Sequence, residues 1–307
     1  GGLLALAAGI KLFPVVLLGY YLLRGQRRVL WGALIASGAL ALLILVATGG
    51  SGLAIMRDLP AVAATDTALY QNQSLAWVPR WLALEAGATP GTATTLLGYV
   101  LIAAVAATFA ATIYATHRAA RYPLPRAGAQ PPSGAVLTAG AADVLAYSWA
   151  LVTMVLVSPV TWMHHDAWLL PAFIICVGYA LRDLAGGTHN STGRINPALY
   201  LLAAVLFGYL LTMNLLPFGY DGVSAPHLGP YVGGHPLRPL LMLLRPLGTL
   251  LLWAAAGTLY LRAARPTIYP GSEQTGSPSL RLLIATLTGL LAAMIALWTI
   301  LLPIWYV

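Results

Sequence analysis

Long runs of apolar residues alternate with short polar connections along the chain. An α-helix needs about 20 such residues to cross the ~30 Å hydrocarbon core of a bilayer. Runs close to this length cover residues 3–23, 29–48, 94–116, 141–158, 167–182, 197–216, 239–261 and 282–305. The pattern predicts an all-α fold, a polytopic transmembrane helical bundle with about eight spans that forms one integral membrane domain over residues 1–307.

The composition supports this prediction. Of the 307 residues, 59% are hydrophobic and only 8% are charged, whereas a soluble domain usually carries about 25% charged residues. The formal net charge of +8 raises the question of nucleic-acid binding. The bases, however, lie in short clusters between the apolar runs, which is typical of topology signals in a multi-pass protein of the cell membrane.

The distribution of arginines predicts the orientation. Arginine-bearing connections lie at residues 24–28, 117–126, 182–196 and 262–281. The connections at 49–93, 159–166 and 217–238 are poor in bases. The two sets alternate along the chain, so the positive-inside rule places the first set in the cytoplasm and the second set outside.

The stretch SPVTWMHHDAW, residues 158–168, places titratable groups between two apolar runs. Trp162 suits the membrane interface, and Asp166 suits the cap of the next helix. His164 and His165 are either interfacial polar residues or catalytic or phosphate-binding groups. A metal site is a further alternative. Adjacent helical residues point about 100° apart, however, so all three side chains of the His-His-Asp run would not easily bind one ion.

A second polar segment, DTALYQNQSLAWVPRWL, covers residues 66–82 in the longest outer connection. It contains Asn72, Gln73, Ser74 and Arg80 among aromatic residues. This segment is either an amphipathic stretch that rests on the bilayer or a groove for a polar, hydroxyl-rich ligand, which amides and aromatic faces would suit.

Lys11 lies inside the first apolar run, about 12 Å from its outer end at 1.5 Å per residue. An ammonium group at that depth is either a functional group or a side chain that reaches back to the surface. The single cysteine, Cys176, also lies in an apolar run and is expected to be a small buried residue. A cation, two imidazoles and an amide-rich loop on one face would suit a phosphorylated lipid that carries a sugar.

Three segments together resemble a known family. AAGIKLFPVVLLGYYLLRGQRR, YQNQSL and SPVTWMHHDAWLLP are similar, in this order, to glycosyltransferase family 87. That family includes bacterial polyprenyl-phosphate-mannose-dependent α-1,2-mannosyltransferases. The resemblance covers residues 5–175 and implies a GT-C-like membrane fold that transfers a sugar, with inversion, from a lipid-phosphate donor to a lipid or glycan hydroxyl.

The resemblance also implies roles for individual residues. His164 or His165 would assist at the leaving phosphate or the acceptor. The substrate-binding set would be Lys11 near the donor phosphate, with Asn72, Gln73, Ser74, Arg80 and Trp162 around sugar and phosphate. No cofactor is implied besides the donor substrate, and a requirement for a divalent cation stays open.

One expected element of the GT-C group has no match. An acidic general base would follow the first span, in a region expected upstream of Gly1, so the chain resembles the C-terminal part of a longer protein and is expected to be inactive alone. Asp58 and Asp66 are stand-in candidates. A transporter or flippase of a polyprenyl-linked amphiphile is the alternative function, and a structural subunit is a third. Collection of the polar groups at one face favours a transferase.

Overall fold

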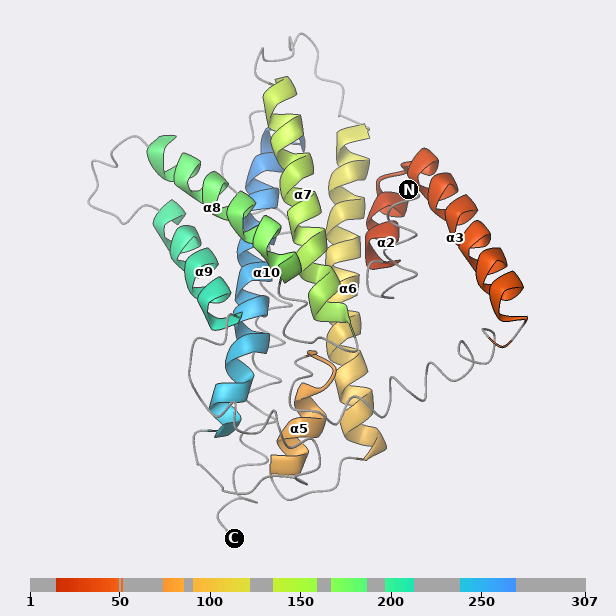
Figure 1. Cartoon of the computed structure of the whole chain (residues 1–307). Coiled ribbons are helices and arrows are strands. Elements are labelled where there is room, and N and C mark those ends of the chain that lie inside the picture. The colour runs from red at the N-terminus through yellow and green to blue at the C-terminus, as the bar shows by residue number, and fades with distance from the viewer. Residues whose placement is uncertain are drawn as a thin grey trace.

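The computed structural model describes residues 15–49, 51, 74–85, 91–121, 135–158, 167–186, 197–212 and 238–268. Within these ranges the regular elements are helices, and no strand occurs. Figure 1 shows them gathered into a bundle. The helices are α2 (Val15–Leu23), α3 (Arg27–Thr48), α5 (Val78–Glu85), α6 (Thr92–Arg121), α7 (Ala135–Val157), α8 (Leu169–Gly186), α9 (Pro197–Thr212) and α10 (Arg238–Ile268).

The described part of the chain contains four helices that are long and apolar enough to cross a membrane. They are Arg27–Thr48 in α3, Thr92–Arg118 in α6, Gly140–Val157 in α7 and Pro246–Ala264 in α10. The predicted all-α membrane fold is therefore confirmed.

The number of spans differs from the prediction of about eight. The apolar part of α9, Ala198–Thr212, is only about 23 Å long at 1.5 Å per residue. The apolar part of α8 is shorter still, because Arg182 and Asp183 lie near its end. Residues 3–14 of the first expected span and the whole of 282–305 lie outside the described residues. The long described helices fall on expected apolar runs, but not every run makes a helix of spanning length.

Three cross-helix contacts show which helix ends meet. They join Arg24 to Asp143, Thr116 to Tyr260, and Arg262 to Asp183. The C-terminal ends of α6, α8 and α10, the chain after α2 and the first turns of α7 therefore lie toward the same end of the bundle, the upper half of Figure 1. We call this end, with Arg24, Arg118, Arg182 and Arg262, the arginine end. The far end of the bundle is the opposite end.

Aromatic side chains fill the middle of the bundle. The ring of Trp149 in α7 lies 4.9 Å from Phe109 of α6 and 5.4 Å from Trp253 of α10, measured between centroids. All three are buried. The indole N–H of Trp253 donates to the hydroxyl of Thr153 at 2.9 Å, which satisfies a polar group that would otherwise be costly in an apolar interior.

Helix α3 stands apart from this core and packs against α2 (Figure 1). Only 6% of its apolar window is buried, compared with 72% for α7. Large apolar side chains such as Trp31, Ile35 and Val46 are exposed along it. In a membrane such side chains face lipid, so α3 has the surface expected of a peripheral spanning helix.

Candidate active site

A short helix and the turn before it lie at the opposite end of the bundle. Helix α5 has eight residues and is about 12 Å long, too short to cross a bilayer. Leu75, Trp77, Val78 and Leu82 are buried, so the segment is packed into the bundle, near the lower parts of α6 and α10 in Figure 1. The described part of the predicted polar segment, residues 74–82, is thus anchored by its apolar residues.

Ser74 connects this turn to the end of α7. Its Oγ donates a hydrogen bond to the carbonyl oxygen of Ser158 at 2.5 Å and accepts one from the N–H of Ala76 at 3.2 Å. Ser158 follows Val157, the last residue of α7, where backbone carbonyls have no partner within the helix. The hydroxyl of Ser74 supplies such a partner, and both serines are buried.

The turn is also pressed against α6. A Cβ atom added to Gly98 would lie only 1.9 Å from the carbonyl oxygen of Ala76, so no side chain fits between them. The N–H of Trp77 donates to the carbonyl of Ser74 at 3.0 Å and closes the turn. Residues 74–77 are therefore wedged between α6 and the end of α7.

Arg80 provides a cation beside this turn. Its guanidinium carbon lies 4.5 Å from the ring centroid of Trp77, a cation–π geometry. The arginine is partly buried and the tryptophan is buried. A partly desolvated guanidinium attracts an anion more strongly than one in water, and its planar donor fork suits phosphate oxygens.

Two of the predicted site residues, Ser74 and Arg80, are described by the structure. Both lie in or beside the turn before α5, with Ser74 against the residue that opens the histidine segment. The other predicted residues lie outside the described ranges: Lys11, Asn72, Gln73, Trp162, His164 and His165, and the acids Asp58, Asp66 and Asp166. Along the chain, Gln73 precedes Ser74 directly, and Pro159 follows Ser158 directly. The hydrogen bond between Ser74 and Ser158 therefore joins the two predicted segments at the residues next to Gln73 and Pro159.

Sequence reasoning missed Ser158, Gly98 and Trp77 as contacts of the site. The sequence indicates Ser158 only as the end of a span. Its role depends on a backbone carbonyl, which no side-chain motif reveals. The sequence shows Trp77 only as one aromatic residue in a polar segment. Its contact with Arg80 depends on the helical backbone at the start of α5, which the sequence did not predict.

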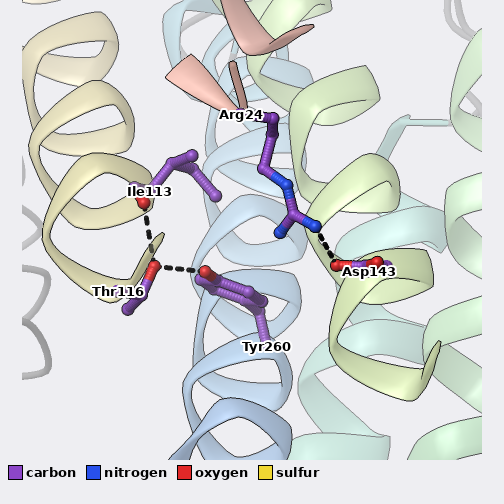
Figure 2. Close-up of polar contacts among 5 residues, drawn as sticks. All are labelled: Arg24, Ile113, Thr116, Asp143 and Tyr260. Atoms are coloured by element: carbon purple, nitrogen blue, oxygen red, sulfur yellow. Dashed lines mark hydrogen bonds and ion pairs between the residues drawn. The ribbon is translucent and has the colours of Figure 1, made fainter. Parts of the chain in front are cut away.

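A separate polar cluster lies at the arginine end (Figure 2). Arg24, after α2, pairs with Asp143 of α7, and Thr116 of α6 shares a hydrogen bond with Tyr260 of α10. Thr116 also bonds the carbonyl of Ile113 in its own helix at 3.0 Å. These contacts tie four helices together at the end away from Ser74, so we assign the cluster to the framework.

No group of three or more His, Cys, Asp or Glu side chains that could hold a metal is formed among the residues that the structure describes. Cys176 is fully buried in α8, as expected from its apolar run.

The described helices define a helical membrane protein, and the turn before α5, with Arg80 beside it, lies away from the arginine end. Residues 1–130 match the sequence profile of glycosyltransferase family 87, which confirms the family resemblance over a segment that includes Ser74, Arg80 and Gly98. The match indicates a membrane glycosyltransferase. Neither the curated proteins nor the solved structures compared with the chain gave a match.

Proposed function

We propose that the protein transfers a sugar, with mannose as the expected one, from a polyprenyl-phosphate donor to a hydroxyl of a lipid or glycan acceptor. The reaction takes place at the outer face of the cell membrane and inverts the anomeric carbon. The observation that supports this proposal is the hydrogen bond between Ser74 and Ser158. It links the amide-rich segment to the start of the histidine segment, which the sequence alone keeps 84 residues apart.

The proposed chemistry is stabilisation of a leaving phosphate. As the sugar leaves, negative charge develops on the lipid phosphate, and nearby cations lower the energy of that state. Lys11 and Arg80 are the proposed cations. Arg80 lies beside the turn at the opposite end. A histidine that titrates near neutral pH can move a proton at the leaving phosphate or the acceptor, the role proposed for His164 or His165.

The proposed recognition of the sugar uses amides and aromatic faces. Asn72 and Gln73 carry both donors and acceptors, which match the hydroxyls of a sugar, and Trp162 offers an apolar ring face. Asn72 and Gln73 directly precede Ser74 in the sequence, and Ser74 itself is held against the end of α7.

The arginines at one end of the bundle support a particular orientation of the protein in the membrane. Arg24, Arg118, Arg182 and Arg262 gather at one end, which the positive-inside rule places in the cytoplasm. The turn before α5 then faces outward, together with the proposed site. A transporter would need polar groups along a path through the bundle. In the described bundle, buried aromatic rings such as Trp149 and Trp253 lie in the middle. The buried hydroxyls of Thr108, Ser148 and Thr153 donate to carbonyls of their own helices, which favours a structural role for them.

The test is sugar transfer by the full-length protein in membranes supplied with polyprenyl-phosphate-mannose. The variants His164→Ala, His165→Ala, Lys11→Ala and Arg80→Ala are compared with wild type at equal protein level. We expect the loss of one required group to reduce transfer by about 10²–10⁴-fold. Absence of transfer by the wild type from any lipid-phosphate sugar, or normal transfer by all four variants, would reject this assignment. Movement of the intact donor across vesicles would then favour a flippase.

A further inference from the structure

The hydroxyl of Ser74 is engaged on both sides by the protein itself. It donates to the carbonyl of Ser158 and accepts from the N–H of Ala76. Ser74 is 1% exposed and Ser158 is 5% exposed. A serine with its proton already donated to a buried carbonyl is badly placed to donate to a sugar, so its position between two candidate segments needs another explanation.

The contacts around Ser74 hold the turn from three directions. The carbonyl of Ser158 receives its hydroxyl on the α7 side, and Gly98 allows the carbonyl of Ala76 to touch α6. The N–H of Trp77 closes the turn on the carbonyl of Ser74. Of these contacts, only the one to Ser158 reaches the chain that leads to the histidines.

We infer that Ser74 is a positioning residue rather than a ligand of the substrate. Its hydrogen bond to Ser158 fixes the backbone at Ser74, which directly follows Asn72 and Gln73 in the sequence, relative to the end of α7, from which the chain continues to His164 and His165. This inference rests on the proposed function. The consequence is that loss of the hydroxyl misaligns sugar and phosphate with the histidines, although every group that touches the substrate is still present.

The expected kinetic signature follows from that distinction. A misplacement of about 1 Å at a reacting centre can reduce the rate by about 10²-fold. Loss of a direct substrate contact that binds ground state and transition state equally instead raises KM and leaves kcat unchanged. For loss of the Ser74 hydroxyl we expect kcat to fall by about ten- to hundredfold, with KM for the donor changed by less than about threefold.

The decisive comparison uses two variants of nearly equal shape, Ser74→Thr and Ser74→Val, in the full-length protein. Both add a methyl group to the same buried position, and only the threonine keeps an O–H donor. Ser148→Ala is the matched control, because Ser148 is also buried and its hydroxyl bonds Val144 within its own helix at 2.9 Å. Donor-dependent transfer rates and the thermal unfolding midpoint are measured for each.

A reduced kcat in Ser74→Val, with near-normal kcat in Ser74→Thr and Ser148→Ala, supports the inference. Equal kcat values for the threonine and valine variants would overturn it, whether both are active or both are inactive. A rise in KM alone would overturn it as well, because Ser74 would then contact the donor. Failure of the proposed function is seen separately, as absence of transfer by the wild type.

Discussion

Two glycines allow α9 and α10 to cross in close contact, and filling either one tests how that crossing contributes to stability. A Cβ atom on Gly208 would lie 2.9 Å from the carbonyl oxygen of Gly248. One on Gly248 would lie 2.6 Å from the carbonyl oxygen of Gly208 and 2.6 Å from Cβ of Leu211. Small residues at such crossings are typical of membrane helices, because they let backbones approach each other.

The magnitude follows from these distances. Ordinary contacts between carbon atoms lie at about 3.5–4.0 Å, so Gly248→Ala must move the helices apart by most of an ångström. Overpacking of this kind costs about 1–3 kcal/mol, while alanine in a helix interior recovers about 0.5–1 kcal/mol relative to glycine. We expect a net loss of about 1–2 kcal/mol, equivalent to a fall of roughly 2–8 °C in the unfolding midpoint.

Cys176 provides the assay. It is the only cysteine in the sequence and it is fully buried, so a maleimide dye reacts with it only when the bundle opens. Gly38→Ala is the control, since Gly38 lies in helix α3 where an added Cβ atom would meet open space, and its midpoint is expected to stay level or rise. The combination of Gly208→Ala with Gly248→Ala should cost less than the sum of the single changes, because both act on one contact. A Gly248→Ala midpoint equal to or above that of the control would refute the close crossing.

Three further predictions concern other contacts of the bundle. Thr153→Val should lower stability by about 1 kcal/mol, the range for hydrogen bonds between membrane helices, because the N–H of Trp253 loses its acceptor. Thr153→Ser keeps the acceptor and should be near wild type, so equal unfolding midpoints for the two variants would contradict this. Asp143→Ala should destabilise more than Asp183→Ala in the same unfolding assay, because the arginine partner of Asp143 is 17% exposed and that of Asp183 is 38% exposed; the reverse order would be evidence against a framework role. Gly98→Ala should reduce sugar transfer more than Gly38→Ala does, since its Cβ displaces the turn at Ala76, and unchanged transfer would exclude that wedge from the site.

Hydropathy predicted the positions of the long helices well. The expected span 94–116 corresponds to α6 at Thr92–Arg121, and 141–158 corresponds to α7 at Ala135–Val157. A segment that spans a membrane must satisfy its backbone polar groups internally, so a long apolar run has few alternatives to forming a helix. Helix α5 was missed because eight residues with a proline and an arginine carry neither the length nor the apolar content of a span.

The candidate site was only partly predictable for a different reason. Composition and motif order pointed to the segments that contain Ser74 and Arg80, and the structure describes both residues at the same end of the bundle. The partner of Ser74 is the carbonyl of a residue 84 positions away. Its seat on α6 depends on the absence of a side chain at Gly98. Neither contact can be read from the sequence. Every residue has a backbone carbonyl, and a glycine in a sequence does not show which atoms approach it in the fold.

Helix α7 explains why a single hydroxyl can position a loop in this protein. The helix is paired through Asp143 at the arginine end, packed through Trp149 in the middle and extended to Ser158 at the opposite end. With 72% of its apolar window buried, it is surrounded by close-packed neighbours that resist small shifts. A hydrogen bond to a flexible loop would restrain little. The bond from Ser74 instead ends on the most buried spanning helix that the structure describes, so the turn before α5 takes its position from the framework of the whole bundle.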